Sequence, residues 1–391
     1  MSRLVVFPSD PIEAYLKQGK SYKYLEGYFN PGLFFDEVFA ISLYGKNETI
    51  GSIHYLQCKT KEIHSVIKSI KPDVVRAYGG YISSDLAYLS KVEGIPIVVS
   101  VHDTNPNLLY ESLQYADYVI CTSNCVRKAV IDKTGYDERY MWVLPNRIDS
   151  KLFYRHVNHT EIENLNNLFG RKKHILHVGR KSYEKNLETL IKALKYLPDD
   201  TVAIFVGTGD DNSYKRIAIE NGVSERCYWV ESVKKDELPY WYSWCDCFCT
   251  PSRWEGFGFV FIEAAGCEAP IVTSNIAPMN EYLTNNKDAL LVDDYENPRA
   301  LANAIGYCLS NDVNVEIMRH NARKVGMKFD KKIVDSKEID IYKEIMKKGV
   351  RVTYDDASLR RKLILRYRKK SHKIIISNIV LKALRRIKSA I

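Results

Sequence analysis

The chain has 391 residues, 46% of them hydrophobic and 27% charged, which is typical of a globular protein with two domains of ordinary size. It contains no apolar run of about 18 residues, so we expect no membrane-spanning helix. The nine cysteines are an odd number scattered along the sequence, which argues against a disulfide framework and for a reducing compartment. Residues 4–7 form too short an apolar run for a signal peptide, so we expect a cytoplasmic protein.

The net charge of +9 is concentrated at the end of the chain. Residues 351–391 hold thirteen Lys or Arg and two Asp, a net of +11, so the remaining residues carry about −2. The basic character therefore belongs to a tail, and we expect three parts: domains at 1–150 and 151–350, and a basic tail at 351–391.

The first part reads as an α/β domain with buried parallel strands, because short, continuous apolar runs alternate with loops. These runs span residues 4–7, 37–42, 73–76, 96–101 and 117–123. Gly79 and Gly80 form a turn after the third run, where a ligand could approach, although a plain tight turn is the simpler interpretation. His102 follows the fourth run, at a strand end where open α/β sheets bind ligands.

A second α/β pattern follows a polar connector at residues 156–173. Its apolar runs span residues 175–178, 202–206, 227–230, 246–250, 270–274 and 289–292. Gly179, Arg180 and Lys185 follow the first of these runs. Two cations at a strand end could hold phosphate oxygens, the Arg as a fork and the Lys as a point charge, or they could be solvated surface charges.

Residues 251–265 carry the most specific pattern in the chain. They read Pro-Ser-Arg-Trp-Glu-Gly-Phe-Gly-Phe-Val-Phe-Ile-Glu-Ala-Ala, with glycines between a predicted buried strand and a predicted helix. Gly256 and Gly258 allow close backbone approach to a ligand, and the following helix would offer backbone N–H groups to an anion. Glu255 and Glu263 frame this bend, and carboxylates accept hydrogen bonds from sugar hydroxyls.

This string resembles the donor-binding signature of glycosyltransferase family 4. The resemblance covers roughly Asp73 to Met346 and is strongest between Gly179 and Val292. It implies an α/β GT-B fold, in which two Rossmann-like domains face each other across a cleft, and a retaining reaction. The first domain would bind the acceptor and the second the nucleotide sugar.

The resemblance also implies a role for each candidate residue. Arg180 and Lys185 would hold the donor diphosphate, together with the backbone N–H groups of Phe257 and Gly258. Glu263 would bind the ribose hydroxyls. His102 and Glu255 would be the catalytic residues, His102 orienting the sugar or the incoming hydroxyl and Glu255 holding the sugar hydroxyls beside Gly256. Gly79 and Gly80 would form an acceptor-side turn.

Three features depart from the family pattern. Arg147 stands where an interdomain Pro-Asn-Gly motif usually has Gly, and Ala269 stands where Gly usually precedes Pro. The first 50 residues offer only Gly19-Lys20 near the usual paired-glycine loop, so no first-domain phosphate loop is assigned.

The sequence thus predicts transfer of a hexose from a UDP- or GDP-linked donor to a hydroxyl of a glycan or glycolipid. Two alternatives remain: a sugar-nucleotide epimerase or phosphorylase on the same fold, and a non-catalytic scaffold at a membrane surface. We expect no cofactor and no metal, because cations already stand where a metal would act. Cys245, Cys247 and Cys249 alternate along one strand, too widely spaced to converge on zinc, and read as buried small side chains.

The tail has a basic cluster at 360–370 and then an apolar stripe with helical spacing. The stripe consists of Ile376, Val380, Ala383, Leu384, Ile387 and Ile391. From Arg360 to Ile391 the chain could bind an anionic membrane as an amphipathic helix, or it could pack on the protein body. We expect no nucleic acid, because no nucleic-acid-binding fold accompanies the basic residues.

Overall fold

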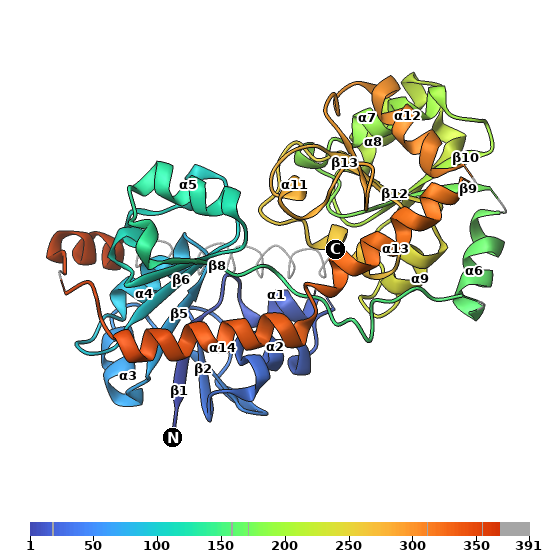
Figure 1. Cartoon of the computed structure of the whole chain (residues 1–391). Helices are drawn as coiled ribbons and strands as arrows, with labels where there is room; N and C mark the ends of the chain where they lie inside the picture. Colours follow the sequence, from blue (N-terminus) through green and yellow to red (C-terminus); the bar gives the residue numbers. More distant parts are fainter. Residues whose placement is uncertain (18, 158, 171, 311, 354, 368–391) are drawn as a thin grey trace, which may run out of the picture. The chain divides into compact units, whose positions relative to one another are not determined.

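A computed structural model describes the whole chain except residues 18, 158, 171, 311, 354 and 368–391 (Figure 1). The chain forms two compact units. Unit 1 comprises Met1–Cys121, Ala129–Trp142 and the described residues from Glu338 onward, and unit 2 comprises Thr122–Lys128 and Val143–Lys337.

Unit 1 is built on an eight-stranded sheet with the order β3-β4-β2-β1-β5-β6-β7-β8. Its strands are β1 (Arg3–Phe7), β2 (Glu37–Ser42), β3 (Glu48–Ile50), β4 (Ile53–Gln57), β5 (Val74–Tyr78), β6 (Ile97–Val101), β7 (Tyr118–Cys121) and β8 (Met141–Val143). Its helices are α1 (Ile12–Lys17), α2 (Tyr22–Phe29), α3 (Ile63–Ile70) and α4 (Ile82–Leu89), and α5 (Asn124–Thr134) ends in it.

The central strands of this sheet pair in parallel, and the apolar runs predicted for them are confirmed. All five residues of β5 and of β6 are buried, as expected for strands covered on both faces. The edge strand β3 and its neighbour β4, which pair with each other antiparallel, were not predicted; β4 also pairs in parallel with β2. β4 buries alternate residues only and β3 buries none of its residues, so neither has a continuous apolar run.

Unit 2 has a six-stranded sheet with the order β11-β10-β9-β12-β13-β14, and every neighbouring pair among these described strands is parallel. Its strands are β9 (Lys173–Val178), β10 (Thr201–Val206), β11 (Cys227–Val230), β12 (Cys247–Thr250), β13 (Ile271–Ser274) and β14 (Leu290–Val292). Its helices are α6 (Thr160–Phe169), α7 (Leu187–Ala193), α8 (Asp211–Glu220), α9 (Leu238–Trp244), α10 (Phe259–Gly266), α11 (Met279–Tyr282), α12 (Pro298–Cys308) and α13 (Val313–Met327).

Two hydrophobic layers enclose this second sheet. One contains buried side chains of α10 and α13, and the other contains those of α7, α8 and α12. Because the sheet is covered on both faces, its polar chemistry is confined to the loops at the strand ends, and two of these loops form the candidate site.

The last described part of the chain belongs to unit 1. α14 (Lys331–Lys348) begins in the range of unit 2 and continues in unit 1, where Glu338 and Tyr342 contact Arg76 of β5. A further helix at 357–367 buries Leu359 and Leu363 against α4. The structure thus places residues 338–350 with the first unit, whereas the sequence predicted a second domain up to 350.

Helix 357–367 also bears on the two alternatives for the tail. Tyr367 donates a hydrogen bond to Asp85 at 2.6 Å and is buried, so this part of the predicted tail packs on the protein body. The apolar stripe predicted at 376–391 lies outside the described residues. Among the helices that the structure describes, none is long and apolar enough to cross a membrane.

Candidate active site

The first element of the site is the loop 179–185 that follows β9. Gly207 and Gly209 hold it against the loop after β10, because a Cβ on Gly207 would lie 2.0 Å from the Gly179 carbonyl oxygen. The backbone N–H of Lys181 donates to the Thr208 carbonyl at 2.8 Å. The Lys181 ammonium is buried and pairs with Asp211 at 2.7 Å. These contacts fix the loop that carries Arg180 and Lys185.

A second set of contacts joins this loop to the segment after β12. The Arg253 guanidinium binds the carboxylates of Glu188 at 2.5 Å and Glu296 at 2.6 Å, and it donates to the Tyr183 carbonyl at 2.6 Å. The backbone N–H of Arg253 donates to the Glu184 carbonyl at 2.8 Å. Because β9 and β12 are neighbours in the sheet, these two loops leave it side by side.

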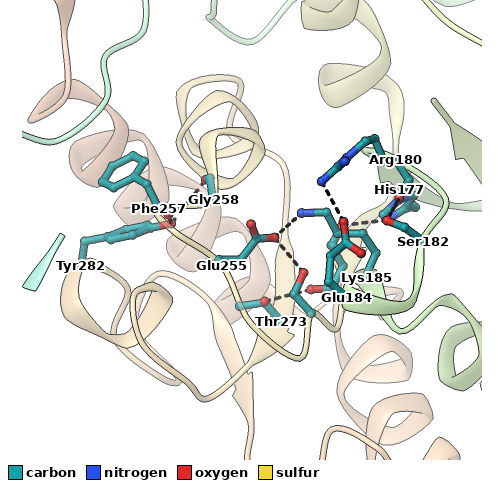
Figure 2. A network of polar contacts seen from close by, with 12 residues as sticks. His177, Arg180, Ser182, Glu184, Lys185, Glu255, Phe257, Gly258, Thr273 and Tyr282 are labelled. Atoms are coloured by element: carbon teal, nitrogen blue, oxygen red, sulfur yellow. Dashed lines mark hydrogen bonds and ion pairs between the residues drawn. The ribbon is translucent and has the colours of Figure 1, made fainter. Parts of the chain in front are cut away.

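The centre of the site is an ion pair between Lys185 and Glu255. The ammonium Nζ lies 2.6 Å from Glu255 Oε1, and Ser252 Oγ donates to the same oxygen at 2.8 Å (Figure 2). The two charged side chains are only 14% and 10% exposed, so water screens their charges weakly. The structure thus places Lys185, one of the two predicted phosphate-binding cations, beside Glu255, one of the two predicted acids, which directly precedes Gly256.

Arg180 lies in the same loop but in a different setting. Its side chain is 76% exposed, and its guanidinium pairs with Glu184 at 2.9 Å (Figure 2). An exposed ion pair of this kind adds little stability. The guanidinium can therefore exchange Glu184 for a phosphate at small cost.

The glycine bend has the predicted geometry between a strand and a helix. Gly258 adopts a φ of 78° at the start of α10, and a Cβ there would lie 2.5 Å from the Phe261 ring. The Phe257 ring is buried and stacks on Tyr282 at 5.2 Å, so Phe257 offers its backbone and not its ring to a ligand. The Tyr282 hydroxyl donates to the Phe257 carbonyl at 2.8 Å, which helps to hold the bend.

Glu263 lies inside α10 and is buried. Its carboxylate accepts a hydrogen bond from Tyr242 at 3.1 Å and lies 3.3 Å from the Lys235 ammonium. Burial raises the pKa of Glu263, and Lys235 and the Tyr242 hydrogen bond oppose this rise. The ammonium therefore favours the ionised form, which is the form that binds two hydroxyls most strongly.

His177 lies beneath the phosphate-side loop, at the end of β9. Its Nδ1 lies 2.9 Å from the Thr250 hydroxyl, and its Nε2 is buried with no hydrogen-bond partner among the described residues (Figure 2). Burial and the nearby Lys185 lower the pKa of His177 to about 3. The imidazole is therefore neutral and adds no positive charge to those of Arg180, Lys181 and Lys185 in the loop.

In unit 1, His102 follows β6 directly, as predicted. Its ring lies parallel to the Tyr78 ring with centroids 6.3 Å apart, and its Nε2 is buried with no partner in the described part of unit 1. Burial and the charge of Arg76 lower its pKa to about 4, although Glu338 acts in the opposite direction. His102 is therefore neutral near pH 7 and can donate or accept a hydrogen bond.

Gly79 and Gly80 form the turn between β5 and α4. Gly79 has a φ of 115°, and a Cβ on Gly80 would lie 3.1 Å from the Leu108 carbonyl oxygen. The backbone N–H of Tyr110 donates to the Gly80 carbonyl at 2.7 Å. Protein atoms thus fill the space beside these glycines, and the turn admits the segment that follows His102.

Comparison with known proteins identifies the family. Residues 158–325 match the model of the group 1 glycosyl transferases, and residues 51–152 match the model of glycosyltransferase family 4. The chain belongs to glycosyltransferase family 4.

Individual relatives of the chain are also glycosyltransferases. An uncharacterized glycosyltransferase of Methanocaldococcus jannaschii is 25% identical over 302 residues, which cover 75% of this chain and 73% of that protein. The O-antigen chain mannosyltransferase B of Escherichia coli is 29% identical over 178 residues, 43% of this chain and 45% of that protein.

The solved structures that are similar establish the fold. Anabaena HepE, solved in complex with UDP, has a TM-score of 0.72 at 18% identity and covers 88% of this chain and 100% of its own. A glycosyltransferase from Rickettsia africae has a TM-score of 0.74 at 18% identity and covers 88% and 99%. The predicted GT-B fold, with two α/β domains built on parallel sheets, is confirmed.

Several polar residues of this family 4 site were not predicted from the sequence. They are Lys181, Lys235, Tyr242, Ser252 and Arg253. The only local signal was a charged or polar residue beside a named motif, and such residues are common in a chain with 57 Lys and Arg. His177 had a clearer signal, because it interrupts an apolar strand.

Proposed function

We propose that this glycosyltransferase transfers a hexose from a UDP- or GDP-linked donor to a hydroxyl of a glycan or glycolipid, with retention at the anomeric carbon. The observation that carries the proposal is the Lys185–Glu255 ion pair at the glycine bend. A nucleoside diphosphate gains negative charge as it leaves, and a fixed, weakly screened cation stabilises that charge without reorganisation of solvent.

The proposed role of each residue follows from its setting. Lys185 and Arg180 hold the diphosphate, and the backbone N–H groups of Phe257 and Gly258 assist them. Glu255 accepts hydrogen bonds from sugar hydroxyls while its contact with Lys185 holds its carboxylate in place. Glu263 binds the ribose.

The proposed chemistry needs no protein base. In this scheme Glu255, whose carboxylate lies 2.6 Å from the Lys185 ammonium, binds the sugar and takes up no proton. The acceptor hydroxyl attacks the face that the leaving group vacates, and a phosphate oxygen of that group takes the proton. Neutral His102 orients the sugar or the incoming hydroxyl by a hydrogen bond. The cations also replace a metal ion in this scheme.

Relatives guide the choice of donors and acceptors to test. Anabaena HepE was solved with UDP-glucose, and one relative is a GDP-mannose-dependent mannosyltransferase acting on a phosphatidylinositol monomannoside. Both nucleotide classes and both free and lipid-linked glycans therefore belong in the screen.

The experiment measures donor turnover and transfer over a panel of UDP- and GDP-linked hexoses, with and without EDTA. Lys185→Ala and Glu255→Gln are each expected to lower kcat by about 100-fold, because each removes a group that acts on developing charge. Lys192→Ala and Glu220→Gln, at exposed helix positions of unit 2, are expected to retain wild-type rates.

Undiminished transfer in both site variants would overturn the proposal. A product with the inverted anomeric configuration would contradict the retaining mechanism. Loss of activity in EDTA would contradict the metal-free scheme.

A further inference from the structure

Unit 1 contains a cavity that the proposed donor chemistry does not use. It has a volume of about 430 Å³ and lies between α4, the end of α5 and helix 357–367. This volume falls within the range of about 300 to 1,000 Å³ that small-molecule sites occupy. Helix 357–367, coloured red in Figure 1, forms one wall of the cavity.

The cavity is joined to the segment that follows His102. Leu109 and Tyr110 line it, and the backbone of Tyr110 is bonded to Gly80 in the turn before α4. The wall of the cavity thus continues into the segment that leads from His102 to Tyr110, and Tyr110 is bonded to the turn at Gly80. The sequence predicts both His102 and this turn on the acceptor side.

Its floor is apolar and rigid. Leu109, Leu359 and Leu363 line the cavity and are all buried. Leu359 and Leu363 are held in place by packing against Tyr88 and Leu89 of α4. A flat apolar face of a ligand can therefore contact a preformed surface.

The charges that line the cavity are balanced, because its lining holds two carboxylates, Asp85 and Glu111, and two cations, Arg366 and Lys133. Asp85 pairs with Arg366 at 2.9 Å, and Glu111 pairs at 3.0 Å with Lys362, which does not line the cavity. A phosphate placed here would lie near two carboxylates as well as near the cations. The lining therefore favours a neutral, hydroxyl-rich ligand over a strongly anionic one.

Two rim side chains are available to such a ligand. Gln114 and Lys133 are exposed and line the cavity, and their side chains form no hydrogen bond or ion pair within the described residues. An amide offers two donors and an acceptor, and an ammonium offers three donors. Sugar hydroxyls match both groups.

We propose that this cavity binds a neutral sugar unit of the acceptor glycan. The leucine floor takes the C–H face of the sugar, and Gln114, Lys133 and the carboxylates at the rim take its hydroxyls. This inference rests on the proposed function, since it concerns the acceptor of the same enzyme. It identifies that acceptor as a chain of sugars, one of which binds in this cavity, away from the hydroxyl that reacts.

The first test reads sugar binding directly and needs no donor. Saturation-transfer NMR is recorded with the methyl α-glycosides of glucose, mannose and galactose on the wild type and on Gln114→Trp, which fills the cavity from an exposed position. Glu93→Trp, on the exposed loop between α4 and β6, is the matched control. At least one glycoside is expected to bind the wild type and the control, and Gln114→Trp should lower that signal about fivefold.

The same measurement on Lys185→Ala separates this inference from the proposed function, because the signal should persist when the donor site is disabled. The inference is wrong if none of the three glycosides binds, if Gln114→Trp binds as well as the wild type, or if inorganic phosphate displaces the sugar at equal concentration. Phosphate displacement would assign the cavity to an anionic headgroup.

A kinetic test follows on the intact enzyme once a donor and acceptor turn over. Gln114→Trp and Lys133→Ala are expected to raise the acceptor KM about tenfold and to leave kcat and the donor KM unchanged. An unchanged acceptor KM in both variants would overturn the inference.

Discussion

At the scale of single residues, each acid of the donor site in unit 2 lies beside a cation. Glu255 has Lys185 at 2.6 Å, and buried Glu263 has Lys235 at 3.3 Å. The two histidines are buried near cations, and both effects favour the neutral imidazole. They lower the pKa of His177 in unit 2 to about 3 and the pKa of His102 in unit 1 to about 4. Unit 2 thus sets its acids beside cations and keeps a neutral imidazole at His177, and His102 of unit 1 is also neutral at pH 7.

Replacement of Lys235 is expected to change the pH dependence of donor binding. Burial raises the pKa of Glu263, so the donor KM should rise as the pH falls and Glu263 takes up a proton. Lys235→Met removes the cation that lowers this pKa, so the acid rise in KM should move to higher pH. Lys234→Met is the control, since Lys234 is 79% exposed and pairs with Glu237. Identical pH profiles for Lys235→Met and the wild type would contradict the assigned role of Glu263.

At the scale of elements, the donor site depends on two loops held together by backbone contacts. Gly207 and Gly209 let the loop after β10 approach the loop after β9 closely enough for direct hydrogen bonds. Arg253 then ties the β9 loop to the segment before the glycine bend. The position of Lys185 is thus decided by three strand ends together.

A glycine pair tests this arrangement. Gly207→Ala and Gly222→Ala both place a side chain at positive φ, a strain of about 1–3 kcal/mol. Only Gly207→Ala also clashes with backbone, since a Cβ on Gly222 meets no atom within 4 Å. We expect Gly207→Ala to lower Tm further and to weaken nucleotide-sugar binding, as measured by thermal shift. Equal effects of the two substitutions would show that the loop contact is unimportant.

At the scale of the whole molecule, the end of the chain is part of the first unit. Residues 355–367 return to α4, where Tyr88 donates to Asp355 at 2.6 Å and Tyr367 donates to Asp85. Helix 357–367 thus contributes to the core of unit 1, which is the domain predicted to bind the acceptor. The rest of the basic tail, residues 368–391, follows this helix in the sequence.

Truncation should separate the packed part of the tail from a membrane-binding part. A chain ending at Tyr367 keeps the buried leucines and should retain the wild-type Tm, whereas one ending at Asp356 should melt at lower temperature. Residues 368–391 carry eight Lys or Arg, each contributing about 1 kcal/mol near an anionic surface. Sedimentation with anionic liposomes should therefore recover the full chain and not the chain ending at Tyr367. Equal sedimentation of both would exclude membrane binding by this segment.

The sequence alone determined the central strands of the first sheet, the strands of the second sheet, the glycine bend, the two framing acids and the family. These features are local, because a buried parallel strand needs a continuous apolar run and a bend at positive φ needs Gly. Only the tertiary structure decided that Glu255 pairs with Lys185, that Lys235 supports Glu263, and that helix 357–367 closes a cavity on α4. Each of these contacts joins segments far apart in the chain, and sheet order and packing, which no local pattern encodes, bring them together.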